Sequence, residues 1–158
     1  MSIGIEVQAP NRVIIPDGYY SLFLAGSIEM GKAEKWQERV VRELSDLPLV
    51  FMNPRRDDWD SSWEQKIENK QFNEQVTWEL KSLEDADFII LYLDPNTQSP
   101  ISLLELGLHA SYNIFVCCPE GFWRKGNVDI VCERYGIPTY DNIEDLLEGI
   151  RRIIDTCI

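Results

Sequence analysis

Histidine is nearly absent from the chain, and none of its cysteines forms a CxxC pair. One His and scattered thiols are too few ligands, at the wrong spacing, for a zinc site, so we expect no metal. Free thiols also suit a reducing compartment, and the cytoplasm is the expected location. The cysteines are Cys117, Cys118, Cys132 and Cys157.

Long apolar runs and basic runs are missing as well. No stretch approaches the roughly 20 apolar residues that span a bilayer, and residues 1–11 contain no apolar core of a signal peptide. The formal net charge of −12, from 27 acidic and 15 basic residues, would repel a phosphate backbone. We therefore expect neither a membrane nor a nucleic acid as partner, whereas nucleosides are compatible with this charge.

The chain does contain an alternation of short apolar runs with amphipathic segments of helix length. This alternation is typical of βαβ units around a parallel sheet, so the predicted class is α/β. The length of 158 residues predicts a single domain, 1–158, with a doubly wound, flavodoxin-like or Rossmann-like sheet of about five strands. The expected strands are 20–25, 49–52, 88–93, 114–117 and, more weakly, 137–140, and 13–15 is a candidate edge strand.

Helices are expected to fill the segments between the strands. Their predicted ranges are 32–45, 64–86, 101–112, 128–135 and 143–155. The longest irregular stretch, 53–62, follows the second strand, and long loops at the carboxyl ends of strands in such folds usually hold ligands. This loop is a candidate wall of a site.

Glu105 is the one acid inside an otherwise apolar helix. Ser99 and Pro100 are typical of an N-cap and of the first helical position, so this helix should begin there. Its Leu and Ile side chains point in every direction around the axis, as expected of a helix buried against the sheet and a neighbour. A buried carboxylate is costly unless it is paired or has a chemical role. Glu105 is therefore either a catalytic group or the partner of a basic side chain.

Glu79 repeats this pattern in the preceding helix, because it falls within an apolar stripe rather than on the charged face. The stripe consists of Phe72, Val76, Leu80, Leu83 and Ala86. Two acids on helices that flank one strand could converge at its carboxyl end, where open α/β sheets bind ligands. Such a pair suggests glycosyl chemistry, in which one acid attacks an oxocarbenium-like centre and the other moves a proton. The alternative for Glu79 is a carboxylate that reaches solvent or caps a backbone group.

These residues carry a resemblance to the nucleoside 2-deoxyribosyltransferase family and its relatives, the 2'-deoxynucleoside 5'-phosphate N-hydrolases. Residues 23–28 (FLAGSI) resemble the family's opening sugar-binding loop. Residues 78–80 (WEL), before Ala-Asp and an apolar strand, place Glu79 at the acid/base position. Residues 105–107 (ELG) place Glu105 at the nucleophile position. The pieces together span 22–118.

The resemblance implies a double displacement. Glu105 would attack C1' of a 2'-deoxynucleoside, Glu79 or Asp58 would help to protonate the leaving base, and a second base or water would then attack the sugar ester. The implied substrate-binding residues near the sugar are Gly26, Ser27, Asp94 and Ser99. Thr97 and Ser102 are alternatives to Ser99 as the polar residue that contacts the sugar or its 5' substituent. The implied ligands are deoxynucleosides and free nucleobases, with no cofactor.

Two outer segments resemble a less studied branch of the group: 53–59 (NPRRDDW) and 122–127 (FWRKGN). In that context Asp58 and Trp59 would read or stack the base, and Asn127 would reach a sugar hydroxyl in its own or a neighbouring subunit. Relatives complete their sites across subunits, so a homo-oligomer is expected. A surface ion pair at Asp58 and a packed Trp59 are the alternative.

The chain also departs from the family pattern. The acid/base position is usually Asp, so Glu79 is one methylene longer. Phe23 stands where relatives often have a Tyr that hydrogen-bonds the nucleophile, which leaves Tyr92 or Tyr20 as sources of a hydroxyl. Phosphate-using relatives usually have Arg where this chain has Glu29, whose charge would repel a 5'-phosphate.

The predicted function is therefore a nucleoside 2-deoxyribosyltransferase that uses free deoxynucleosides better than their 5'-monophosphates. One alternative is a hydrolase that acts on deoxynucleoside 5'-monophosphates. Another is a nucleotide-sensing module without catalysis, in which Glu105 would only bind ribose hydroxyls and would form no adduct.

Overall fold

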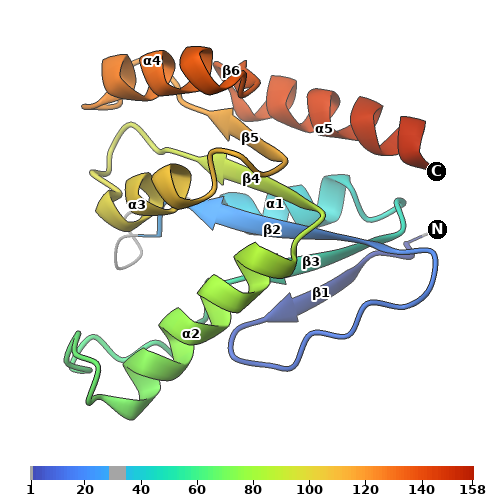
Figure 1. The fold of residues 1–158 in the computed structure, drawn as a ribbon. Helices are drawn as coiled ribbons and strands as arrows, with labels where there is room; N and C mark the ends of the chain where they lie inside the picture. Colours follow the sequence, from blue (N-terminus) through green and yellow to red (C-terminus); the bar gives the residue numbers. More distant parts are fainter. Residues whose placement is uncertain (1, 29–34) are drawn as a thin grey trace.

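The computed structural model describes residues 2–28 and 35–158, and these residues form a six-stranded parallel sheet flanked by helices (Figure 1). The strands are β1 (Ile5–Gln8), β2 (Tyr20–Gly26), β3 (Leu49–Asn53), β4 (Phe88–Tyr92), β5 (Ile114–Cys117) and β6 (Thr139–Tyr140). Their order in the sheet is β1-β3-β2-β4-β5-β6. The predicted α/β class with a doubly wound parallel sheet is confirmed, and β1 adds one strand at the edge.

The prediction of an edge strand at residues 13–15 is wrong. β1 takes the edge and pairs with β3, with Ile5 opposite Val50. Residues 13–15 lie instead in the connection between β1 and β2, between Pro10 and Pro16. Proline has no N–H to donate to a ladder, so a run bracketed by prolines is a poor strand despite its apolar residues.

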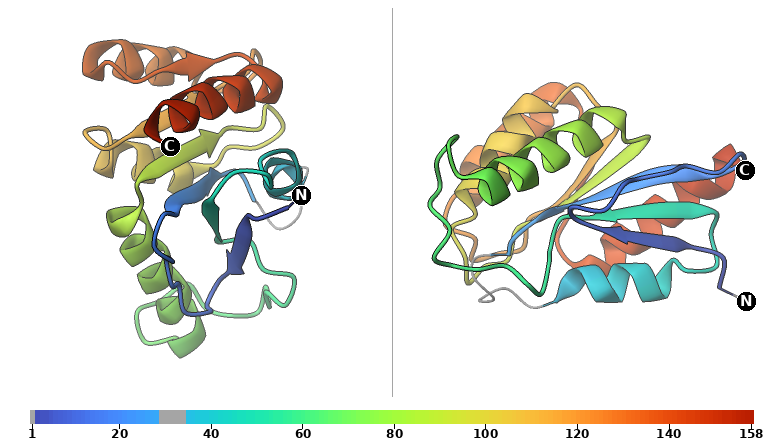
Figure 2. Two further views of the ribbon diagram at one scale, coloured as in Figure 1. Left: turned by 90° about the vertical axis from the view of Figure 1, so that its right-hand side faces the viewer. Right: turned by 90° about the horizontal axis from the view of Figure 1, so that it is seen from below.

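The helices lie on both faces of the sheet: α1 and α5 cover one face, and α2, α3 and α4 cover the other (Figures 1 and 2). They are α1 (Trp36–Glu43), α2 (Lys70–Asp85), α3 (Pro100–Leu108), α4 (Lys125–Tyr135) and α5 (Ile143–Cys157). The start predicted for α2, at residue 64, is wrong. The side chain of Asn69 accepts a hydrogen bond from the backbone N–H of Phe72 at 2.9 Å and caps the helix there. Residues 54–69 therefore form one long β3–α2 loop.

Strand side chains alternate between the two faces and divide the core into two layers. Leu22 and Leu24 pack towards α1 and α5, whereas Phe23 and Ala25 pack towards α2, α3 and α4. Because both faces of β2, β3 and β4 are covered, these strands are apolar over most of their length. The apolar runs of these three strands could therefore be recognised in the sequence.

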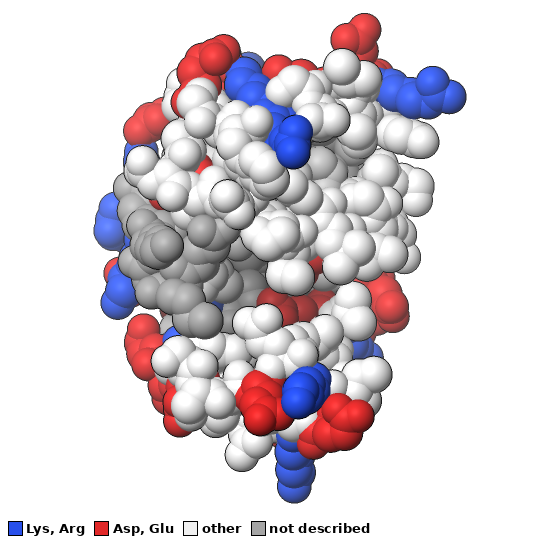
Figure 3. Space-filling model, turned by 90° about the vertical axis from the view of Figure 1, so that its left-hand side faces the viewer, with Lys and Arg blue, Asp and Glu red and all other residues white. Residues whose placement is uncertain are grey.

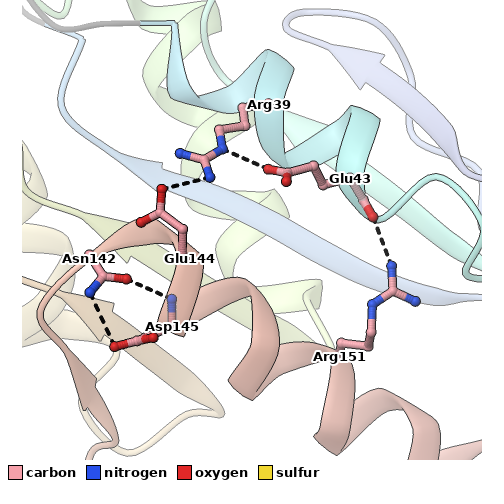
Figure 4. Close-up of polar contacts among 6 residues, drawn as sticks. All are labelled: Arg39, Glu43, Asn142, Glu144, Asp145 and Arg151. Atoms are coloured by element: carbon pink, nitrogen blue, oxygen red, sulfur yellow. Dashed lines mark hydrogen bonds and ion pairs between the residues drawn. The ribbon is translucent and has the colours of Figure 1, made fainter.

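Polar contacts join α1 to α5 along one side of the sheet (Figure 4). Arg39 donates to Glu43 on its own helix at 2.7 Å and to Glu144 on α5 at 2.8 Å. Arg151 of α5 donates to the backbone carbonyl of Glu43 at 2.8 Å and pairs with Asp46. Exposed pairs of this kind contribute about 0–1 kcal/mol each, so the apolar layer between the helices and the sheet dominates their packing.

Gly26 ends β2 at the point where the chain direction in the sheet reverses. From β2 the chain passes to β3 on one side and then crosses to β4 on the other, so the carboxyl ends of β2 and β4 frame the crevice where such sheets bind ligands. Gly26 has φ +138°, and a Cβ on it would lie 2.2 Å from the carbonyl oxygen of Tyr92. Only glycine fits this contact.

We predict that Gly26→Ala lowers the free energy of unfolding by about 2–4 kcal/mol, because it adds backbone strain and a steric clash. Urea unfolding monitored by circular dichroism measures the change. Gly107→Ala is the matched control: it lies within α3, a Cβ there meets no atom within 4 Å, and helix propensity favours alanine by about 1 kcal/mol. Equal stability of the Gly26→Ala variant and the wild type would contradict the prediction.

Candidate active site

Three hydroxyl groups meet where β2 and β4 end. Ser27 Oγ lies 2.6 Å from Ser99 Oγ and 2.9 Å from Thr97 Oγ1, and the last two atoms are 2.7 Å apart. The backbone N–H of Asp94 donates to Ser27 Oγ at 2.8 Å, and the Asp94 carboxylate accepts from the N–H of Asn96. Ser27, Asp94, Thr97 and Ser99 are all buried. The structure thus brings the predicted sugar-binding residues of the β2 turn and the β4–α3 loop together.

Ser99 has a left-handed backbone, with φ 49° and ψ 53°, and no other non-glycine residue of the described chain has a positive φ. This conformation costs about 1–3 kcal/mol and persists where the surroundings fix it, often at functional sites. Ser99 occupies the predicted N-cap position before Pro100, but its side chain makes no capping hydrogen bond. Its hydroxyl turns to Ser27 and Thr97 instead.

Glu105 and Glu79 approach each other from α3 and α2. Glu105 is 8% exposed; burial raises its pKa to about 8, and the charge of Glu79 contributes to this rise. Glu79 is half-buried; burial raises its pKa to about 7, whereas the amide of Gln75 acts in the opposite direction. The charge of Glu79 on α2 therefore acts on Glu105 of α3, and both helices cover the same face of the sheet.

Neither carboxylate has a basic partner within residues 2–28 and 35–158. The ion pairs of this part of the chain involve other acids, such as Asp58, Asp85 and Glu144. The alternative in which Glu105 pairs with a basic side chain is therefore not realised among these residues. Among these residues, protonation is the remaining way to limit the cost of burying both groups.

The two tyrosines considered as sources of a hydroxyl for Glu105 point elsewhere. Tyr20 donates to the carbonyl oxygen of Cys157 at 2.8 Å, near the end of α5. The ring of Tyr92 packs against Trp36 of α1, with ring centroids 5.5 Å apart. Both tyrosines belong to the layer under α1 and α5, whereas α3 carries Glu105 on the opposite face of the sheet.

The β3–α2 loop, residues 54–69, is organised around Arg56. The guanidinium donates to both carboxylate oxygens of Asp58, at 2.8 and 3.0 Å, and lies 5.3 Å from the ring centroid of Trp63. Trp59 packs edge-on against Trp63, with centroids 4.8 Å apart. The ion pair and the packed Trp of the alternative interpretation are thus present, and the base-binding roles of Asp58 and Trp59 stay predictions.

Asn127 lies exposed in the first turn of α4. The segment before α4 contacts the β4–α3 loop, because the indole N–H of Trp123 donates to the carbonyl oxygen of Gln98 at 2.8 Å. The start of α4 therefore borders the region of Ser99. No contact joins Asn127 to the two acids in the described part of the chain, and its contact with a sugar stays a prediction.

Gln75 is a site residue that the sequence analysis missed. It is 5% exposed, and its side-chain amide donates to the carbonyl oxygen of Pro54 at 2.9 Å. Its position four residues before Glu79 places both on neighbouring turns of α2, and this spacing was a usable signal. Its contact with the β3–α2 loop could not be read from the sequence.

The edge at which the strands end is hollowed at its centre, and acidic atoms are recessed in the hollow beside uncharged surface (Figure 3). No cluster of three His, Cys, Asp or Glu side chains suited to a metal ion occurs in the described ranges. The same residues include no helix that is long and apolar enough to cross a membrane. Glu29 and the expected helix start at 32 lie outside the described residues.

Comparison with protein families matches residues 19–122 to the family described as nucleoside 2-deoxyribosyltransferase like. The matched range runs from the start of β2 to the loop after β5 and includes both Glu79 and Glu105. The resemblance seen in the sequence is thereby confirmed. No curated protein matches the chain.

We predict that Glu105→Gln raises the melting temperature by several degrees above pH about 8 and by much less near pH 4.5. Because the pKa of Glu105 is raised to about 8 from 4.5, the folded state holds this proton more tightly than the unfolded chain. The resulting stabilisation is full below pH about 4.5 and is lost as the pH rises through about 8. Glutamine stays neutral throughout.

Thermal unfolding at a series of pH values measures this difference. Glu133→Gln, the same change at an exposed position of α4, serves as the control and should show no such trend. A melting-temperature difference between Glu105→Gln and the wild type that is constant from pH about 4.5 to 9 would show that Glu105 titrates normally.

Proposed function

The chain belongs to the nucleoside 2-deoxyribosyltransferase-like family, and from this premise we propose that it transfers 2-deoxyribose between nucleobases through a covalent intermediate on Glu105. The observation that carries the proposal is the burial of Glu105 beside Glu79 with no basic partner in the described chain. A carboxylate without a cation is free to stabilise positive charge that develops on a sugar.

In the first displacement a Glu105 oxygen attacks C1' of a 2'-deoxynucleoside. The C1'–N bond breaks, its electron pair goes to the base nitrogen, and Glu79 gives its proton to the departing base. The sugar stays on Glu105 as an ester, and Glu79 is left ionised. In the second displacement a nitrogen of another base attacks C1' and the ester C–O bond breaks. Glu79 takes the proton that the incoming base loses, and two inversions return the β anomer.

The two acids together hold the number of protons that this sequence needs, although the higher pKa of Glu105 puts that proton on Glu105 in the free protein. The reaction starts with Glu105 ionised and Glu79 protonated, which requires one proton for the pair. With pKa values of about 7 and about 8, the pair holds close to one proton at slightly alkaline pH. An oxocarbenium-like sugar favours the ionised form of Glu105 and therefore leaves that proton on Glu79.

The surrounding residues have proposed roles in binding. Gly26, Ser27, Asp94 and Ser99 would line the sugar end of the crevice. Asp58 and Trp59 would face the base from the β3–α2 loop. The buried hydroxyl cluster and the left-handed Ser99 support this assignment, because both hold the β4–α3 loop in one shape beside the acids.

A homo-oligomer is part of the proposal. The prediction that α3 is buried all round does not hold within one chain, because Ile101, Leu104 and Leu108 are 60%, 58% and 55% exposed. Three large apolar side chains on one side of a helix that carries Glu105 suit an interface with a second copy. Asn127 would then contact a sugar in its own or in the neighbouring site.

The proposed location is the cytoplasm. Cys117, Cys118 and Cys132 are buried and free, and Cys157 is exposed and free. Burial raises the pKa of the Cys117 thiol to about 12, which keeps it protonated and unreactive. Reduced thiols of this kind are usual in a reducing compartment.

We predict that the purified protein exchanges the base of a deoxynucleoside only when a different free base is supplied, and that Glu105→Gln abolishes the exchange. Chromatography of the reaction with and without the second base measures this. Mass spectrometry of the quenched wild type should show an adduct of one deoxyribosyl group, which the Glu105→Gln variant lacks.

Two other outcomes would favour the alternative functions. Free sugar as the main product, or a preference for the 5'-monophosphate, would indicate the hydrolase. A bound nucleoside without any adduct would indicate the sensor.

We predict a smaller loss for Glu79→Gln, because protonation of the leaving base contributes about 10²- to 10⁴-fold to the rate. The loss should be greatest with bases that leave poorly and least with bases that need no proton. Rates of base release for a series of deoxynucleosides measure this dependence. Equal activity of wild type and Glu79→Gln with good and poor leaving bases alike would remove Glu79 from the acid/base role.

A further inference from the structure

A cavity of about 370 Å³ lies beside α2, on the side where the connection between β1 and β2 runs. α2 lines it with Trp78, Lys81, Ser82 and Asp85, which recur every three or four residues and therefore share one face of the helix. The volume falls within the roughly 300–1,000 Å³ that is usual for small-molecule sites. Neither acid of the proposed active site lines this cavity.

Most of the cavity wall is apolar. Met52 of β3, which is 1% exposed, lines it from the sheet, and Val13 and Ile15 line it from the β1–β2 connection. The indole N–H of Trp78 donates to the carbonyl oxygen of Asn11 at 2.8 Å and ties the connection to α2. The apolar residues that suggested a strand at 13–15 therefore enclose a cavity instead.

Arg12 gives the cavity a net positive charge. Lys81 and Asp85 form an ion pair at 2.7 Å, so their charges cancel. Arg12 also lines the cavity, and its guanidinium has no ion pair or hydrogen bond with any residue in the described ranges. On a chain with a formal net charge of −12, an unpaired cation at an apolar cavity favours an anionic ligand.

Ser82 adds a polar group without a partner. This residue is 5% exposed, and its hydroxyl forms no side-chain hydrogen bond within residues 2–28 and 35–158. The hydroxyl of Ser21, which also lines the cavity, is instead fully engaged: it accepts from the N–H of Asp87 at 2.8 Å and donates to the Asp87 carboxylate at 3.2 Å. An unpaired hydroxyl in such a place is costly, and an acceptor on a ligand would recover that cost.

We propose that this cavity binds a small aromatic carboxylate. The guanidinium of Arg12 and the hydroxyl of Ser82 donate to the carboxylate, and the ring lies among Met52, Val13 and Trp78. An aromatic body is favoured over an aliphatic one, because a thioether sulfur and an indole both interact favourably with an aromatic ring. The proposal does not depend on deoxyribosyl transfer, so it stands even if the proposed function fails.

The test is a titration of the full chain with 3-phenylpropionate at pH about 7, followed by NMR. The indole N–H of Trp78 and the methyl group of Met52 report on the cavity, and Trp78→Phe and Met52→Leu assign their signals. Both signals should shift saturably, with a dissociation constant of about 0.1–5 mM for a ligand of this size. 3-Phenylpropanamide has the same ring and no charge, and it should bind at least about fivefold more weakly.

Substitutions of the two polar groups separate their roles. Arg12→Gln should weaken binding of the acid by about three- to tenfold and leave binding of the amide unchanged. Arg12 is exposed, so this variant should fold. Arg42→Gln, the same change at an exposed position of α1 on the other face of the sheet, is the matched control and should alter neither affinity. Ser82→Ala should weaken binding of the acid by about two- to fivefold.

Three results would overturn the proposal. One is equal affinity of the wild type for the acid and the amide, and another is unchanged affinity for the acid in Arg12→Gln, because either shows that the cavity does not select an anion. The third is the absence of saturable shifts at Trp78 and Met52, including the case in which the probe shifts only signals around Glu79 and Glu105.

Discussion

The repulsion between Glu79 and Glu105 at the carboxyl edge of the sheet is opposed by proton binding and not, within the described chain, by a cation. Both pKa values are raised, with burial as the largest cause for each group. A nearby arginine or lysine would have removed the cost of burial but would also have lowered both pKa values and neutralised the attacking charge. The folded state tolerates the free-energy cost of burying these two acids because two apolar layers stabilise the sheet and the helices that carry them.

The parts of the fold that could be predicted are those in which each segment is specified locally. β2, β3 and β4 are apolar over most of their length because they are buried on both faces, so their apolar runs could be recognised in the sequence. β1 was missed because its alternation of Ile5 and Val7 with polar residues is short and typical of many surface segments. Glu105 could be singled out because burying an acid inside an apolar helix is costly unless the acid is paired or has a chemical role.

The parts that could not be predicted depend on contacts between distant segments. Ser27 and Ser99 are 72 positions apart, and nothing in either local sequence indicates that their hydroxyls meet. The left-handed backbone of Ser99 has the same origin, because serine has no intrinsic preference for it. Gln75 shows both cases: its spacing to Glu79 is local, whereas its bonds to Pro54 and Arg56 exist only after the β3–α2 loop has folded onto α2.

The raised pKa values of Glu79 and Glu105 also change the net charge of the folded protein. The formal net charge of −12 counts Glu79 and Glu105 as ionised at pH 7. The unfolded chain would carry both as carboxylates at this pH, so with pKa values of about 7 and about 8 folding withdraws between one and two protons from the buffer. The enthalpy of folding measured by calorimetry then includes the ionisation heat of the buffer. In native electrophoresis the folded chain should carry less negative charge than its composition indicates.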